Sequence, residues 1–82
     1  MEKVDILLAT YNGEQYLREQ LDSIMCQTYS NFRLLISDDC SSDSTKEILE
    51  EYVEKDKRII VFSQEKNLGV VKNFEFLLKR VE

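Results

Sequence analysis

The chain alternates between two kinds of apolar pattern, and this alternation strongly limits its possible folds. Three short runs are almost continuously apolar, as expected of strands buried on both faces. After each run, apolar residues recur at spacings of three and four, which predicts amphipathic helices. The predicted strands are residues 3–9, 32–37 and 59–63, and the predicted helices are about residues 13–28, 44–56 and 70–81.

Strands joined by helical crossovers form a parallel sheet, because each crossover returns the chain to the same end. Right-handed crossovers place the helices in layers over that sheet. The sequence therefore predicts an α/β fold, a three-layer βαβαβα unit. The helix residues expected to pack on it are Leu17, Leu21, Ile24, Met25, Thr28, Ile48, Leu49, Tyr52, Val53, Val70, Val71, Phe74, Leu77, Leu78 and Val81.

Composition excludes several functional classes. The 82 residues include no His, which removes histidine bases and the usual zinc sites. The formal net charge of −5 and the lack of a basic stripe argue against nucleic acid as a partner. No run is long enough to span a membrane, and the two cysteines suit free thiols in a cytoplasmic protein. We expect Cys26 to be buried, and Cys40 has no evident base that would make it a nucleophile.

Polar residues follow each predicted strand. In an open parallel sheet, ligands bind beyond the carboxyl ends of the strands. We call this edge of the sheet the rim. The candidate rim residues are Ala9, Thr10 and Tyr11 after the first strand, Asp38 and Asp39 after the second, and Asn67, Gly69 and Lys72 after the third.

Each rim motif has a functional and a structural interpretation. Tyr11 either stacks on a nucleobase or packs over a helix start. One of the Asp38 and Asp39 carboxylates is expected to accept loop N–H groups and the other to face a ligand. The alternative is that both carboxylates only cap loops. Residues 41–44 are interpreted as caps of the second helix, through a Ser44–Glu47 capping box or through Asp43. Lys72 or Asn73 either contacts phosphate or belongs to a helix start.

Four segments resemble motifs of family 2 glycosyltransferases. Residues 4–12 are similar to the family's opening strand and turn, and residues 27–36 to its Q-T segment and second strand. Residues 38–43 resemble its D-D-x-S-x-D signature, and residues 67–69 its N-x-G turn. The motifs occur in order and cover nearly the whole chain. The resemblance implies the Rossmann-like front half of a GT-A fold, and sugar transfer from a nucleotide diphosphate sugar with Mg²⁺ or Mn²⁺.

Site roles are also implied by this resemblance. Tyr11 would stack on the base, Thr10 or Ala9 would line its pocket, and Asp39 would accept the base's imide N–H. Asp38 would support the loop or contact the nucleoside. The donor would be a UDP- or dTDP-sugar and the acceptor a saccharide of a cell-surface polysaccharide. Residues 67–74 are similar to rhamnosyltransferase-like members, which points to dTDP.

Two family elements are missing from the sequence. No D-x-D metal motif follows a strand, and no acceptor-side catalytic carboxylate is present. We therefore expect residues 1–82 to be a truncated nucleotide-sugar-binding part, inactive alone, of an enzyme located in the cytoplasm or at the inner face of the membrane. A first strand left at the edge of the sheet would favour self-association. The competing hypothesis is a receiver-like phosphoacceptor or a non-catalytic interaction module.

Overall fold

The computed structural model describes residues 4–26 and 31–81. It contains the six expected elements in the expected order, and the third strand has the predicted bounds. The elements are β1 (Val4–Thr10), α1 (Leu17–Met25), β2 (Phe32–Asp38), α2 (Thr45–Lys55), β3 (Ile59–Ser63) and α3 (Val70–Leu78).

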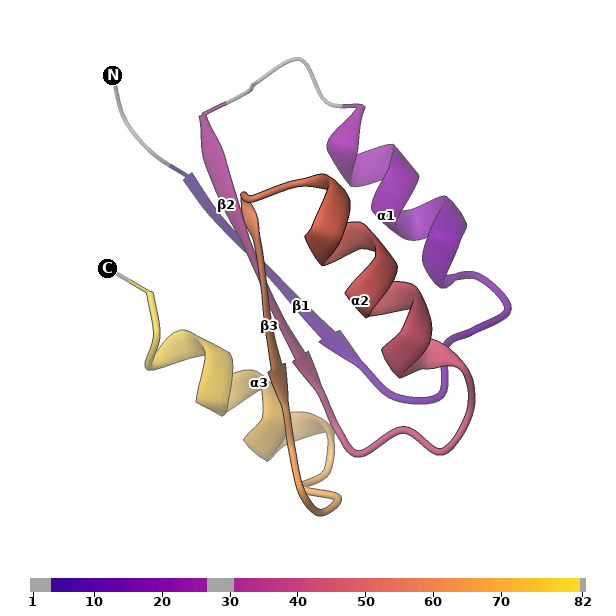
Figure 1. Cartoon of the computed structure of the whole chain (residues 1–82). Coiled ribbons are helices and arrows are strands. Elements are labelled where there is room, and N and C mark those ends of the chain that lie inside the picture. Colours follow the sequence, from indigo (N-terminus) through magenta and orange to yellow (C-terminus); the bar gives the residue numbers. More distant parts are fainter. Residues whose placement is uncertain (1–3, 27–30, 82) are drawn as a thin grey trace.

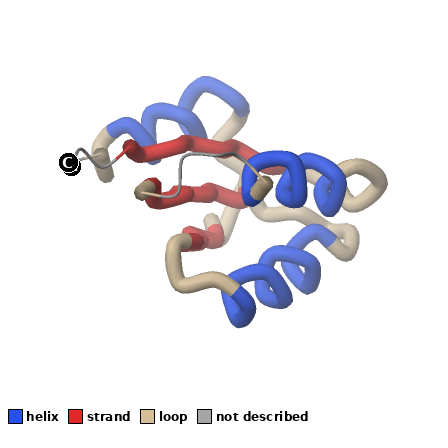
Figure 2. Tube along the Cα trace, turned by 90° about the horizontal axis from the view of Figure 1, so that it is seen from above, coloured by secondary structure: helices blue, strands red, loops and turns tan. Residues whose placement is uncertain are grey.

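The strands form one parallel sheet in the order β1-β2-β3, with β2 in the centre. Thr10 lies opposite Asp38, and Asp38 lies opposite Ser63, so the three strands end at the same level. Figure 1 shows α1 and α2 next to each other on one side of the sheet and α3 on the other side. The view from above in Figure 2 likewise places the strands between the helices. The three-layer α/β prediction is confirmed.

The main core lies between the sheet and the α1–α2 layer. Leu34 and Ile36 of the central strand are fully buried there, and the predicted faces of α1 and α2 pack on them, except for Val53, which is exposed. Both faces of a central parallel strand are covered, which explains why β2 is almost continuously apolar. The buried or partly buried helix residues of this core are Leu17, Leu21, Ile24, Met25, Ile48, Leu49 and Tyr52. Thr28 lies outside the described residues.

The predicted apolar face of α3 is wrong. Leu77 is buried, but Val70 and Val71 are 82% and 70% exposed, and Phe74, Leu78 and Val81 are also exposed. The residue that faces the sheet in their place is Asn73, which is 2% exposed. Its amide donates to the Ser37 carbonyl at 3.0 Å and accepts from the Ser37 hydroxyl. These bonds fix the rotation of α3 about its axis.

Two further expectations near α1 are corrected. The helix predicted from residue 13 begins at Leu17. The N–H groups of Gly13 and Glu14, in the turn before it, donate to Thr45 at the start of α2 and to Asp43 in the loop after β2. Cys26, expected to be buried, is exposed just after the helix ends. Cys40 is partly exposed and is also a free thiol. Among the described residues, no helix has the length and apolar character required to cross a bilayer.

The rotation of α3 can be tested by truncating one buried and one exposed side chain. Asn73→Ala should lower the free energy of unfolding by about 1–3 kcal/mol, because it removes both buried hydrogen bonds between Asn73 and Ser37. Val71→Ala, the matched control on the same helix, should change it by less than about 0.5 kcal/mol. Urea denaturation measures both values. A larger loss from Val71→Ala than from Asn73→Ala would contradict this orientation of α3.

Candidate nucleotide-binding rim

The Asp38 carboxylate joins the ends of the first two strands. Asp38 ends β2 and is completely buried. Its Oδ1 accepts hydrogen bonds from the Thr10 hydroxyl at 2.8 Å and the Ser41 hydroxyl at 2.6 Å, and its Oδ2 accepts the Ser41 N–H at 3.1 Å. A buried carboxylate is stable only when its oxygens are paired in this way. Asp38 therefore accepts a loop N–H group, and Asp39 accepts two, so both carboxylates hold loops in this structure.

The turn after β1 and the loop after β2 exchange hydrogen bonds, and we call this set of contacts the clasp. Ser41 and Thr45 accept the N–H groups of Asn12 and Gly13, both at 2.9 Å. In the other direction, the Asn12 side chain accepts the Ser42 N–H at 2.8 Å. Asn12 adopts a positive φ of 48°, which asparagine tolerates better than most residues. Ser41 thus belongs to the clasp and does not cap α2.

The capping box expected at the start of α2 does not form. Ser44 makes no side-chain capping bond, and its N–H donates to the Glu14 carboxylate at 2.8 Å. Asp43, the alternative cap, accepts the Thr45 N–H at 2.9 Å and the Glu14 N–H at 3.2 Å. Desolvation raises the pKa of the Asp43 carboxyl, but these hydrogen bonds outweigh it and hold that pKa below its ordinary value.

Asp39 connects the second strand to the third loop. It is 3% exposed, and its two carboxylate oxygens accept the N–H groups of Leu68 at 2.6 Å and Gly69 at 3.0 Å. The Asn67 side chain accepts the same Gly69 N–H at 3.1 Å. Gly69 has a φ of 90°, a conformation that favours glycine. The N-x-G segment is thereby fixed against the rim just before α3 begins.

The remaining candidates differ in their accessibility. Tyr11 is 52% exposed, directly after Thr10, and Ala9 is also exposed. Lys72 is exposed in the first turn of α3 and lines a surface hollow with Leu68 and Phe76. Asn73, the alternative phosphate contact, is buried against Ser37 and is not available to a ligand. The structure therefore joins Thr10, Asp38, Asp39, Asn67 and Gly69 by hydrogen bonds, and leaves Tyr11 and Lys72 open to solvent.

Sequence reasoning missed the partners that hold the rim together. Glu14 and Thr45 fall at the starts of two predicted helices, yet both accept backbone N–H groups from the facing segment. Asn12 was interpreted only as part of a turn. Its position before glycine, at the end of a strand, was the one available signal, because such a residue tends to adopt positive φ and to bond backbone groups.

The described residues do not fit a divalent metal site. They contain no group of three or more His, Cys, Asp or Glu side chains placed to hold an ion. The two buried carboxylates of the rim already face hydroxyl and N–H donors, whereas Mg²⁺ requires several oxygen ligands directed at one point.

The junction at Asp38 can be tested by neutralising its charge. Asp38→Asn should lower the free energy of unfolding by about 1–3 kcal/mol, because an amide replaces one acceptor oxygen with a donor that faces other donors. Glu47→Gln, a matched change of an exposed carboxylate on α2, should have almost no effect. Chemical denaturation measures both. Equal stabilities for the two variants would contradict the role assigned to Asp38.

Comparisons with known proteins agree with this architecture. The S. aureus TarS fragment 1–349, solved in complex with UDP, matches 100% of the chain with a TM-score of 0.84 and 35% identity. A mannosyltransferase from Pyrobaculum calidifontis, solved with GDP-Man and Mn²⁺, shares the fold over 96% of the chain with a TM-score of 0.87 and 20% identity. A putative teichuronic acid biosynthesis glycosyltransferase of Bacillus subtilis, TuaG, is 35% identical over 80% of the chain.

The chain spans only part of each of these proteins. It covers 25% of the TarS fragment, 24% of the mannosyltransferase and 26% of TuaG. Other curated relatives are matched over 10%, 21% and 23% of their lengths. The model of the glycosyl transferase family 2 matches residues 5–82, which is nearly the whole chain. The chain therefore belongs to glycosyl transferase family 2.

Proposed function

We propose that this chain forms the nucleotide-binding part of a glycosyltransferase that moves a sugar from a UDP- or dTDP-sugar to a saccharide acceptor. The observation that carries the proposal is the hydrogen-bonded rim, which places an exposed Tyr11 and a buried Asp39 beyond neighbouring strand ends. The UDP complex of the similar TarS fragment supports a uridine nucleotide as ligand. Synthesis of a cell-surface polysaccharide is supported by the name of TuaG.

In this proposal, the base stacks on the exposed ring of Tyr11, with Ala9 and Thr10 beside it. Asp39 accepts the imide N–H of uracil or thymine. Its two oxygens hold one N–H each in the free chain, and a carboxylate offers about four acceptor positions, so it retains capacity for a third bond. Asp38 contributes indirectly, by fixing Thr10 and the loop that carries Asp39.

The third loop is proposed to face the diphosphate. Gly69 lets the backbone approach a ligand closely, and Lys72 in the next turn supplies a positive charge that is exposed in the free chain. A dTDP donor would agree with the rhamnosyltransferase-like character of residues 67–74. The metal ligands and the base that deprotonates the acceptor are proposed to lie in parts of the enzyme that this chain does not supply, and the chain alone is proposed to be inactive.

Nucleotide binding can be followed by amide NMR during titration with UDP or dTDP. We expect shifts near Tyr11 and Asp39 with a dissociation constant of about 1 mM or weaker, because only part of the donor site is present. Tyr11→Ala should weaken binding about tenfold, since stacking on an aromatic side chain contributes roughly 1–3 kcal/mol per base. Tyr16→Ala is the matched control, because Tyr16 is equally exposed but lines a hollow on α1.

Two results would count against this base site. One is the absence of shifts at Tyr11 and Asp39 at about 10 mM nucleotide, well above the expected dissociation constant. The other is an equal loss of binding in the Tyr11→Ala and Tyr16→Ala variants.

We also propose that the isolated chain self-associates through β1. This strand lies at one edge of the sheet, and Val4 at its start is 43% exposed. Edges without a partner strand recruit other strands, and a charge at the edge opposes such pairing. We therefore expect Val4→Lys to reduce association measured by light scattering at about 100 µM. An unchanged mass for that variant would contradict pairing at this edge.

A further inference from the structure

Three polar side chains meet on the α3 side of the sheet, just below the rim. The Ser37 hydroxyl donates to the side-chain oxygen of Asn73, and the Asn73 amide donates to the Ser37 carbonyl at 3.0 Å. The Gln64 amide donates to the Ser37 hydroxyl at 3.0 Å. Ser37 is completely buried, and Asn73 is 2% exposed. We call these three residues the Ser37 cluster.

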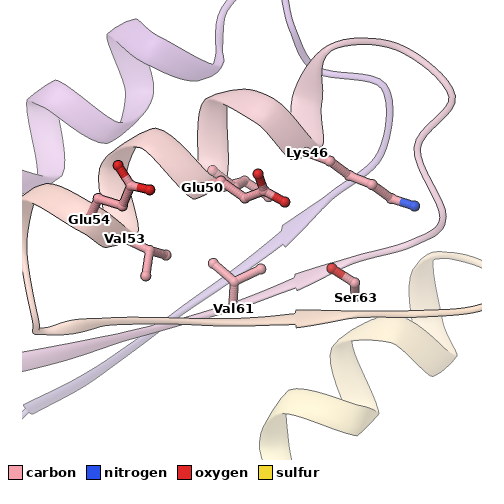
Figure 3. A pocket seen from close by; sticks show the side chains of 7 residues that line it. Lys46, Glu50, Val53, Glu54, Val61 and Ser63 are labelled. Carbon is pink, nitrogen blue, oxygen red and sulfur yellow. The ribbon is translucent and has the colours of Figure 1, made fainter.

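The members of the Ser37 cluster come from three different elements. Ser37 belongs to β2, Asn73 lies in the first turn of α3, and Gln64 directly follows β3. Figure 3 shows the groove between α2 and β3, where the Ser63 side chain points to the α2 side of the strand end. Consecutive side chains of an extended chain alternate, so Gln64 lies on the other side, toward α3. The cluster thus attaches α3 to the ends of two strands.

The Ser37 cluster holds α3 in a rotation that apolar burial alone does not favour. Neighbouring residues of a helix differ by about 100° around its axis. Turning α3 by that angle would place Phe74, now 42% exposed, where Asn73 faces the sheet. It would also break the bonds between Asn73 and Ser37 and leave the buried Ser37 hydroxyl without its acceptor. The polar contacts therefore select one of two packings of α3.

The rotation of α3 decides where Lys72 lies. In the observed rotation, Lys72 lines a hollow together with Leu68, whose N–H is bound by Asp39. The alternative rotation would carry Lys72 to the position of Val71, which is 70% exposed. The Cα atom would move by about 3–4 Å, because Cα atoms lie about 2.3 Å from the axis of a helix. The ammonium group would then point away from the third loop.

We propose that Asn73 is a positioning residue for the diphosphate of the donor. Through Ser37 it fixes the rotation of α3 that keeps Lys72 beside the third loop, without contacting the ligand itself. This inference rests on the proposed function, in which Lys72 and the third loop face the diphosphate. Its effect is confined to that end of the ligand, because the base site at Tyr11 lies beyond β1, in a turn bonded to the loop after β2.

A comparison of two ligands separates positioning from stability. UDP and uridine share the base, and only UDP carries the diphosphate, so the ratio of their dissociation constants in NMR titrations isolates the diphosphate contribution. We expect the original chain to bind UDP about tenfold more tightly than uridine. In the variant S37A/N73L, uridine binding should be unchanged and this ratio should fall to about two or less. Urea denaturation should show a folded variant, because apolar groups replace both hydrogen-bonding side chains.

Further variants show whether Asn73 acts through Lys72. Lys72→Ala should lower the UDP-to-uridine ratio to the same extent as S37A/N73L. Combining the three substitutions should lower the ratio no further, because the same contact is lost in each case. Val71→Ala, a change at an exposed position of the same helix, is the matched control and should leave both dissociation constants unchanged.

The rotation of α3 can also be followed without any ligand. The ring centroids of Phe62 on β3 and Phe76 on α3 are 5.3 Å apart, so their protons should give nuclear Overhauser contacts in the original chain. The alternative rotation moves Phe76 away from β3, and S37A/N73L should therefore lose these contacts.

The outcomes distinguish this inference from the proposed function. The positioning role of Asn73 is overturned by an unchanged ratio in S37A/N73L, by an equal loss of UDP and uridine binding, or by retained contacts between Phe62 and Phe76. Equal affinities of the original chain for UDP and uridine would also overturn it, while leaving the base site in place. If neither ligand binds the original chain, the proposed function fails, and the positioning role fails with it.

Discussion

The arrangement of the rim depends on one buried carboxylate. Asp38 is completely buried where the central strand ends, and three donors, one at the end of β1 and two in the loop after β2, satisfy its oxygens. An unpaired charge at that depth would cost several kcal/mol, so the end of β1 and the loop after β2 are constrained to supply those donors. Because Thr10 is one of them, the position of the exposed Tyr11 beside it follows from the requirement to satisfy Asp38.

The third loop and α3 are attached to the same strand by the same kind of contact. Asp39 accepts the N–H groups of Leu68 and Gly69, and Ser37, two residues earlier, exchanges hydrogen bonds with Asn73 of α3. Consecutive side chains of β2 point to opposite faces, which lets this one strand end hold elements from both layers. Polar contacts thus position the candidate site, while the apolar core between the sheet and the α1–α2 layer supports the strands beneath it.

The strands and their order were predictable because continuous apolar runs joined by helices have few possible arrangements. The faces of α1 and α2 were predictable for the same reason, since their apolar spacing matches the side buried on the sheet. The buried face of α3 was not predictable, because the hydrogen bonds of Asn73 outweigh the burial of Val70 and Val71. The clasp was not predictable either: its bonds join residues about 30 positions apart, which local patterns such as the Ser44–Glu47 capping box do not reveal.

We propose that this polar framework presents a nucleoside site between Tyr11 and Asp39. Isotope-filtered NMR of the chain with excess UDP tests it most directly, by detecting contacts between the uracil ring protons and protein side chains. We expect contacts from uracil to the ring of Tyr11, together with a shift of the Asp39 side chain. Contacts confined to other surfaces, such as the α1 hollow beside Tyr16 or the groove between α2 and β3, would contradict it.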